Sequence, residues 1–255
     1  MNSPIAYIGG KHLLSKQIIQ MIPEHSTYCE VCTGAGWVFF KKDPSSAEVI
    51  NDLDNDLVSF YRVVQHHLEE FLKQFKWILT SRQVFEDFKD QIETGGLTDI
   101  QRAARYYYIQ RNAFGGKVAG RTFGVSVTRP VKINLLRLEE EMSQVHLRLA
   151  GCIIENLHWQ NLIPRYDRPG TFFFIDPPYF KLPYYKHNMT FEDYQAMAEI
   201  LQGIQGKFLL TINDTKEMRA VFSKFKATEA KVMYSANSTG KRPIGRELIF
   251  TNYEA

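Results

Sequence analysis

The chain has 255 residues, of which 44% are hydrophobic and 23% are charged, and its formal net charge at pH 7 is +3. This length allows one large domain or a domain with an insertion, and the apolar content excludes a largely disordered chain. No apolar run reaches the roughly 18 residues of a membrane-spanning helix, and no signal peptide begins the sequence, so we expect a cytoplasmic protein that does not bind membranes.

Three cysteines are too few, and uneven in number, for a disulfide framework. Cys29 and Cys32 have the C-x-x-C spacing of zinc and redox sites, but no second pair of ligands follows at a suitable spacing. We interpret them as thiols packed at the end of a buried strand, and we expect no bound metal.

The first 55 residues alternate between helix and strand patterns. Apolar residues at helical spacing predict a helix over 11–22, which Pro23 ends. Strands are predicted over 27–31, before a glycine turn, and over 47–50, before an acidic residue. This order is the opening of an open α/β sheet.

Residues 56–149 have mainly helical patterns, with helices predicted over 57–75 and 99–111. A glycine-rich segment follows, where the alternation of Phe123, Val125 and Val127 predicts a β-hairpin or a loop.

The α/β alternation then resumes, with a helix predicted over 191–201. Strands are predicted over 152–155, 171–175, 208–212 and 247–251. We therefore predict a discontinuous, Rossmann-like α/β domain of residues 1–55 and 150–255, with residues 56–149 as an inserted, mainly helical domain.

Gly34 and Gly36 follow a predicted strand, where glycines permit a tight turn and the close approach of a ligand to the backbone. Phe39 stands at the third glycine of the dinucleotide-binding fingerprint, so the turn alone does not specify a ligand. Asp52 ends the next strand, where its carboxylate can accept both ribose hydroxyls or cap a helix. Together they predict an adenosine-containing cofactor, either a nicotinamide dinucleotide or S-adenosylmethionine.

Glu30 is a charged residue at the end of an otherwise apolar strand. A buried carboxylate requires a partner. The partner can be the ammonium group of a cofactor, a backbone amide of the glycine turn, or a structural Lys or Arg.

The segment Asp176-Pro177-Pro178-Tyr179 follows four apolar residues of a predicted strand. Asp-Pro-Pro is common in turns, but open α/β sheets bind ligands at the carboxyl ends of their strands. The Asp176 carboxylate and the Pro177 carbonyl can accept hydrogen bonds from an exocyclic amino group, which frees its lone pair to attack a methyl donor. Tyr179 can stack on a base that has been flipped out of the duplex.

The chain resembles the Dam-type DNA adenine methyltransferases, including phage-borne relatives, from Tyr7 to Tyr253. The resemblance rests on Tyr7-Ile8-Gly9-Gly10-Lys11, Glu30-Val31-Cys32-Thr33-Gly34-Ala35-Gly36, Ile50-Asn51-Asp52-Leu53, Asp176-Pro177-Pro178-Tyr179 and Arg246-Glu247-Leu248. It implies an S-adenosylmethionine-dependent enzyme that methylates the amino nitrogen of adenine at specific sites in double-stranded DNA. It also implies that Tyr7, Gly10, Lys11, Asp52 and Asp176 line the cofactor and target pocket.

The chain departs from the family pattern at three places. Asp193-Tyr194 replaces a common Asp-His pair. Val31-Cys32 replaces the usual Pro-Phe, and His158 stands where relatives commonly carry an Asp that helps to hold the cofactor adenine. The resemblance therefore makes His158 a cofactor-binding residue in one tautomer only, and an exposed loop histidine is the alternative.

Residues 102–137 contain eight basic residues and no acidic residue. A solvated protein face normally carries both signs, so this asymmetry predicts a surface that binds DNA phosphates. The predicted DNA contacts are Arg111, Asn112, Lys117 and Arg121. Among the neighbouring Tyr106, Tyr107 and Tyr108, we expect at least two in a helix core.

Three alternatives stay open. An enzyme acting on the amino nitrogen of cytosine is one, although many related motifs begin with Ser or Asn. The second is a catalytically inactive DNA-binding relative, in which we would expect Asp176 or the glycines to be lost. The third is a nicotinamide-linked oxidoreductase, which Phe39 disfavours because it replaces the third glycine of the fingerprint. We expect a monomer, with a dimer on DNA as the alternative.

Overall fold

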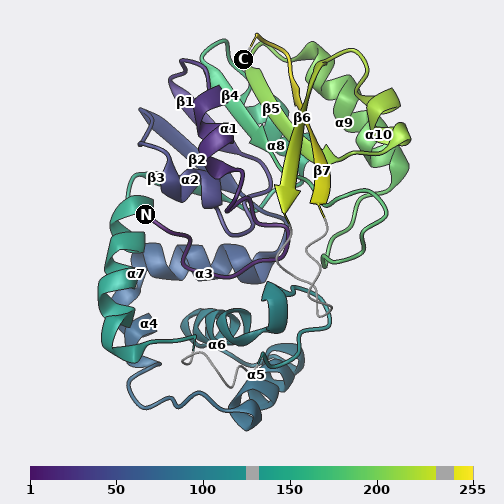
Figure 1. Cartoon of the computed structure of the whole chain (residues 1–255). Helices are drawn as coiled ribbons and strands as arrows, with labels where there is room; N and C mark the ends of the chain where they lie inside the picture. The colour runs from purple at the N-terminus through teal and green to yellow at the C-terminus, as the bar shows by residue number, and fades with distance from the viewer. Residues whose placement is uncertain (125–131, 234–243, 255) are drawn as a thin grey trace.

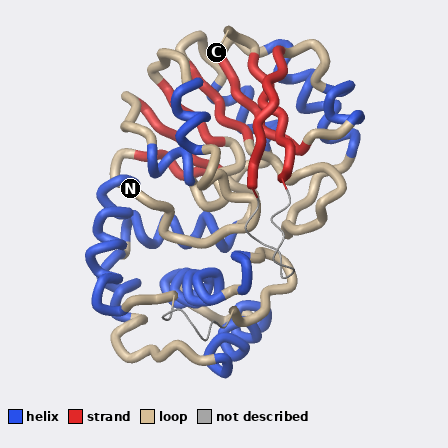
Figure 2. The backbone as a smooth tube through the Cα atoms, in the orientation of Figure 1, coloured by secondary structure: helices blue, strands red, loops and turns tan. Residues whose placement is uncertain are grey.

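The computed structural model describes residues 1–124, 132–233 and 244–254, and it shows a sheet lying next to a layer of helices (Figures 1 and 2). In these ranges seven strands form one sheet in the order β3-β2-β1-β4-β5-β7-β6. The strands are β1 (Thr27–Glu30), β2 (Ala47–Asn51), β3 (Cys152–Glu155), β4 (Thr171–Ile175), β5 (Lys207–Asn213), β6 (Lys226–Met233) and β7 (Ile244–Thr251).

Strands β1 to β5 are parallel, and β7 runs antiparallel between β5 and β6. The predicted Rossmann-like α/β sheet is therefore confirmed. Strand β1 has β2 on one side and β4 on the other, so the chain crosses over in opposite directions from the middle of the sheet. The carboxyl ends of strands at such a switch point border a crevice.

Strand β4 shows why the sheet is covered on both faces. All of its residues are buried, and Phe172 and Phe174 pack into one apolar core while Phe173 and Ile175 pack into the other. A continuous apolar run is typical of a parallel strand with helices on both sides. The covering helices are α1 (Ser15–Met21) and α2 (Trp37–Lys41) on the first face, and α8 (Trp159–Tyr166), α9 (Phe191–Gly203) and α10 (Lys216–Val221) on the second.

The helical layer lies below the sheet in Figure 1. It contains α3 (Asn55–His66), α4 (Leu68–Lys73), α5 (Arg82–Thr94), α6 (Asp99–Asn112), the 3-10 turn η1 (Phe114–Gly116) and α7 (Leu135–Leu149). Phe60 of α3 and Tyr107 of α6 belong to the same apolar cluster as Phe174 of β4. The helical layer therefore continues the core of one sheet face.

Helix α6 places three consecutive tyrosines in this core. Thr98 begins the helix with a capping box, in which its hydroxyl accepts the Gln101 amide and the Gln101 side chain accepts the Thr98 amide. Tyr106, Tyr107 and Tyr108 are all buried, which confirms the expectation for at least two of them and extends it to the third.

Several boundaries differ from the sequence prediction. The helix predicted over 57–75 divides into α3 and α4 at His67, whose φ of −135° is not helical. Helix α8 and strand β6 were not predicted, because α8 contains Pro164 and β6 alternates charged and small residues at a sheet edge. Of the predicted hairpin, the structure describes one antiparallel bridge between Ala113 and Phe123, and Val125 and Val127 lie outside the described residues.

Within the described ranges, no helix combines the length and the apolar character that crossing a membrane requires.

The core position of Tyr107 predicts a large loss of stability on truncation. Its ring lies 5.5–5.6 Å from the rings of Phe60, Phe71 and Phe75. We expect Tyr107→Ala to lower the free energy of unfolding by about 3–5 kcal/mol, because it removes a ring from a packed core. Tyr107→Phe keeps the ring and should stay within about 1 kcal/mol of the wild type in urea unfolding. Equal stability of the two variants would contradict this packing.

Candidate active site

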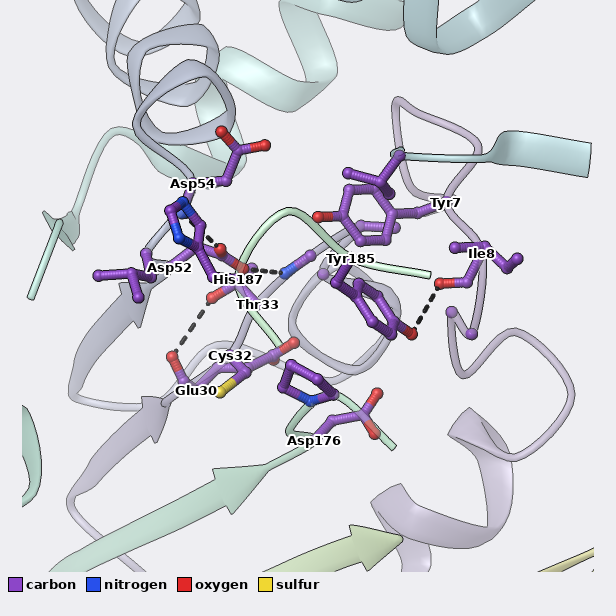
Figure 3. A pocket seen from close by; sticks show the side chains of 18 of the residues that line it. Tyr7, Ile8, Glu30, Cys32, Thr33, Asp52, Asp54, Asp176, Tyr185 and His187 are labelled. Carbon is purple, nitrogen blue, oxygen red and sulfur yellow. Dashed lines mark hydrogen bonds between the residues drawn. The ribbon is translucent and has the colours of Figure 1, made fainter. Parts of the chain in front are cut away.

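A pocket opens at the carboxyl ends of β1, β2 and β4 (Figure 3). It encloses about 960 Å³, including the part that is open to solvent. All eight residues predicted to bind a cofactor line it, namely Tyr7, Gly10, Lys11, Glu30, Gly34, Gly36, Asp52 and His158. Asp176 and Pro178 of the predicted catalytic segment also line the pocket, whereas Pro177 and Tyr179 are not among its lining residues.

The glycine turn after β1 presents bare backbone to the pocket. Gly34 and Gly36 have φ angles of +48° and +64°, which favour glycine over residues with a Cβ atom. A Cβ atom at Gly34 would lie 3.2 Å from Cε1 of Tyr7, so the Tyr7 ring packs directly over the turn. The Tyr61 hydroxyl donates to the Gly34 carbonyl over 2.8 Å and fixes the turn from the other side.

Asp52 joins the end of β2 to this turn. Its Oδ2 accepts the Gly34 amide over 2.8 Å, and its Oδ1 accepts the Asp54 amide over 2.9 Å. Burial raises the pKa of Asp52 to about 6, although these amides act in the opposite direction. Asp54, not Asp52, caps α3, so the cap alternative for Asp52 does not hold.

Glu30 is buried at the end of β1. Its Oε2 accepts the Tyr28 hydroxyl over 2.5 Å and the Phe39 amide of α2 over 3.1 Å. Burial raises the pKa of Glu30 to about 8, against the effect of the Tyr28 hydrogen bond. Among the described residues Glu30 forms no ion pair, so the structural Lys or Arg partner considered above is not found there.

Asp176 stands at the end of β4, where two donors hold its carboxylate. Lys11 Nζ lies 2.7 Å from Oδ2, and Lys11 also donates to the Gly9 carbonyl over 2.9 Å. The Thr211 hydroxyl of β5 donates to Oδ1 over 2.8 Å. Burial raises the pKa of the Asp176 carboxyl, and Lys11 is the main group that opposes this rise.

The residues after Asp176 are fixed by contacts with the second sheet face. The Tyr194 hydroxyl of α9 donates to the Pro178 carbonyl over 2.5 Å. The Asn213 side chain accepts the Phe180 amide and donates to the Phe180 carbonyl, both over 3.0 Å. The ring of Tyr179 is 9% exposed and lies 4.7 Å from Lys11 Nζ. The turn is therefore held in one conformation.

Three residues to which the sequence analysis gave no role lie in or next to the pocket, and two of them, Tyr185 and Lys186, line it. Asn51 is buried and donates to the Val31 and Leu157 carbonyls, which ties together the ends of β1, β2 and β3. The Tyr185 hydroxyl donates to the Ile8 carbonyl over 3.2 Å (Figure 3). Lys186 Nζ lies 3.5 Å from carboxylate oxygens of both Asp54 and Asp56. In the sequence, Asn51 belongs to the motif Ile50-Asn51-Asp52-Leu53, whereas Tyr185 and Lys186 were marked only by a cluster of polar and aromatic residues at 184–188.

The loop after α6 is attached to the wall of the pocket. The Gly116 carbonyl accepts the Ile8 amide over 2.9 Å and the Gln110 side chain over 3.0 Å. Gln110 also donates to the Ala6 carbonyl over 2.6 Å. A Cβ atom at Gly116 would lie 2.9 Å from the Tyr7 amide nitrogen, so only glycine permits this approach.

The four predicted DNA contacts occupy different environments in this region. Lys117 is exposed, and the partly exposed Arg121 stacks its guanidinium 5.1 Å from the centre of the Tyr106 ring. Arg111 donates to the Lys132 carbonyl over 2.6 Å. Asn112 is 1% exposed and donates to the Tyr108 carbonyl over 2.9 Å. Its burial is at odds with the predicted direct contact with DNA, because the side-chain amide group forms its hydrogen bond inside the last turn of α6.

Cys29 is buried and Cys32 lines the pocket. In the part of the chain that the structure describes, no group of three or more His, Cys, Asp or Glu side chains is arranged to hold a metal ion.

Comparisons with known proteins point to one family. The sequence model of the D12 class N6 adenine-specific DNA methyltransferases matches residues 7–236. The chain is 26% identical to the type II methyltransferase M1.LlaDCHI of Lactococcus lactis subsp. cremoris, over 97% of this chain and 94% of that protein. It is 23% identical to the DNA adenine methylase of Escherichia coli K12, over 92% and 89% of the two chains. It is also 23% identical to the DNA N-6-adenine-methyltransferase of Escherichia phage P1, over 85% of this chain and 30% of that protein.

The raised pKa of Glu30 predicts a dependence of stability on pH. Between pH 4.5 and about 8 the unfolded chain has released the Glu30 proton while the folded chain still holds it. The free energy of unfolding therefore falls as the pH rises through this window, by about 1.4 kcal/mol per pH unit from this residue. Glu30→Gln removes the contribution of this residue and should gain about 3 kcal/mol over the wild type between pH 4.5 and pH 7.

Urea unfolding across this pH range measures the effect. Glu24→Gln, at an exposed position, is the matched control and should follow the wild type. If the free energies of unfolding of Glu30→Gln and the wild type changed in parallel with pH, the raised pKa of this buried carboxyl would be contradicted.

Proposed function

Because the chain belongs to the D12 class of N6 adenine-specific DNA methyltransferases, we propose that it transfers a methyl group from S-adenosylmethionine to the exocyclic amino nitrogen of an adenine flipped out of duplex DNA. The observation that carries this proposal is the partly buried Asp176 carboxylate, which follows β4 in the pocket and is held by Lys11 and Thr211.

The pocket residues fit S-adenosylmethionine, which supplies a methyl group on a positively charged sulfur. Glu30 brings a buried carboxylate with a pKa of about 8, and an ammonium group beside it would stabilise its ionised form. Asp52 accepts the ribose hydroxyls, and the bare backbone of Gly34 and Gly36 allows the cofactor to approach closely. Tyr7 packs over this turn.

Three further residues complete the proposed cofactor site. Gly10 leaves room beside Trp37, since a Cβ atom there would lie 2.8 Å from the Trp37 ring. Lys11 forms the wall towards Asp176. His158 lines the pocket at the start of α8, where it can contact the cofactor adenine.

Asp176 overcomes the main chemical difficulty of the reaction. The lone pair of an exocyclic amino nitrogen is delocalised into the base, which makes that nitrogen a poor nucleophile. The Asp176 carboxylate and the Pro177 carbonyl accept hydrogen bonds from the two N–H groups and favour tetrahedral nitrogen, whose lone pair then attacks the methyl carbon. S-adenosylmethionine would supply the methyl group: as the nitrogen–carbon bond forms, the carbon–sulfur bond would break with its electrons going to sulfur, and the methylated nitrogen would release one N–H proton to water. Lys11 favours the ionised form of Asp176 that accepts the hydrogen bond.

The surroundings of this motif favour a flipped base. Asp176 lies inside a pocket, and a base that is stacked in a duplex cannot enter it. We place the adenine ring against the aromatic ring of Tyr179, whose centre lies 4.7 Å from Lys11 Nζ beside Asp176. Pro178 is fixed by Tyr194, so the motif is already arranged before the base arrives.

We assign recognition of double-stranded DNA to residues 56–149. The segment without acidic residues supplies the positive charge, and Lys117 and Arg121 are the proposed contacts with phosphates. Arg111 supports this surface indirectly, because its side chain donates to the Lys132 carbonyl, whereas the Asn112 side chain donates to the Tyr108 carbonyl within α6.

The main test combines methylation with substitution of Asp176. Mass spectrometry of digested product DNA should find N6-methyladenine for the wild type, and Asp176→Ala should lower the rate by at least about 10³-fold because it removes the acceptor in the transition state. DNA binding should persist. Asp214→Asn, at the end of the neighbouring strand β5, is the control and should stay active.

Methylcytosine as the only product would overturn the choice of adenine. Near-normal turnover by Asp176→Ala would overturn the mechanism.

The DNA surface is tested by the salt dependence of binding. If Lys117 and Arg121 each neutralise a phosphate, replacing both with Ala should reduce the slope of log K against log salt by about 1.8. Lys181→Ala is the matched control, because Lys181 is an exposed lysine outside residues 56–149 that pairs with Glu217. An unchanged slope for the double variant would remove both residues from the interface.

A further inference from the structure

Thr211 is a polar residue in the buried part of an apolar strand. Strand β5 reads Lys207-Phe208-Leu209-Leu210-Thr211-Ile212-Asn213, and Thr211 has no exposed surface. A valine would have nearly the same shape and would bury no hydroxyl, and a buried hydroxyl without a partner is costly. The partner of this hydroxyl is Asp176 Oδ1, 2.8 Å away.

The parallel pairing of β4 and β5 brings the two residues together. Ile175 of β4 is in register with Leu210 of β5, so the next residues along the two strands are Asp176 and Thr211. Both strands run in the same direction, and β4 ends at the pocket, where Asp176 lines it. The contact is therefore fixed by the register of the sheet and does not depend on a loop.

We propose that Thr211 is a positioning residue for methyl transfer, because its hydrogen bond fixes the rotation of the Asp176 carboxylate towards the amino group of adenine. This inference rests on the proposed function, since it takes Asp176 as the acceptor of the amino hydrogen bond. Thr211 itself touches neither the base nor the cofactor in this assignment.

Lys11 and Thr211 act on the carboxylate in different ways. Lys11 brings a charge on a flexible four-carbon chain, and its ammonium group is shared with the Gly9 carbonyl. Thr211 is β-branched and its χ1 angle is restricted, so its hydroxyl points in a defined direction from a rigid strand. Lys11 therefore favours the ionised carboxylate, while Thr211 sets its orientation.

The same hydrogen bond influences when Asp176 is ionised. Burial raises the pKa of the Asp176 carboxyl and Glu247 of β7 adds to the rise, whereas Lys11 and the Thr211 hydroxyl oppose it. Glu30 and Cys32, from the end of β1, also interact electrostatically with Asp176. Loss of the hydroxyl should therefore raise this pKa further and move the acid limb of the rate profile to higher pH.

The test compares Thr211→Val, which removes the hydroxyl and keeps the shape, with Thr211→Ser, which keeps the hydroxyl. Single-turnover formation of N6-methyladenine is measured from low to high pH on genomic DNA that lacks adenine methylation. We expect Thr211→Val to lower the plateau rate about tenfold, as for the loss of a hydrogen bond to a charged group, and to shift the acid limb upward. The Kd values for S-adenosylmethionine and DNA should change less than twofold. Thr211→Ser should restore most of the rate and the wild-type acid limb.

Thr171→Val is the matched structural control. Thr171 is buried at the first position of β4 and donates to the Tyr166 carbonyl over 2.8 Å, at the end of the strand opposite Asp176. It should keep the wild-type acid limb. If Thr211→Val does not fold, Thr211→Ala removes the same hydroxyl with less crowding and is measured in its place.

Wild-type rate and pH profile in the hydroxyl-free variant would overturn the inference. So would an equal loss in Thr211→Ser, or a lower rate with no movement of the acid limb, since either result indicates a packing role. These outcomes are distinct from failure of the proposed function, in which the wild type itself forms no N6-methyladenine.

Discussion

The ion pair between Lys11 and Asp176 is the contact on which the pocket depends. Removing two charges from water costs several kcal/mol for each ion, so the pair requires further hydrogen bonds, which Gly9 and Thr211 provide. A buried pair of this kind is weak evidence for stability. The Lys11–Asp176 pair instead determines position: it holds the N-terminal segment against the end of β4, with Tyr7 packed over the glycine turn.

That N-terminal segment connects the two halves of the site. One side of it packs on the Gly34 turn through the Tyr7 ring, and the other side receives the loop after α6 through Gly116 and Gln110. The proposed cofactor and DNA surfaces therefore share one strip of backbone. A substitution at Gly116 would act on both surfaces. The Gly116 carbonyl accepts the Ile8 amide, and an added Cβ atom would collide with the backbone of Ala6 and Tyr7.

Local patterns in the sequence were sufficient for every strand except β6, for the glycine turn, and for the pocket residues that belong to continuous motifs. The apolar run of β4, followed directly by an acidic residue, predicted a buried strand whose carboxyl end borders a ligand site. Residues such as Asn51 and Thr211 could not be found in this way, because their roles depend on strands that are distant in the sequence and come together only in the sheet. The same limit explains the prediction for Asn112. Asparagine is a residue type that contacts DNA, but its position at the end of α6 buries this side chain.

The central claim is that Asp176 receives the amino group of a flipped adenine beside the cofactor. A crystal structure of the protein with S-adenosylhomocysteine and a duplex that contains its target sequence tests this claim most directly. The account predicts the adenine outside the helix, with its amino nitrogen within hydrogen-bonding distance of the Asp176 carboxylate and the cofactor ribose on Asp52. An adenine that remains stacked, or an amino nitrogen bound elsewhere with Asp176 still enclosed by Lys11 and Thr211, would contradict it.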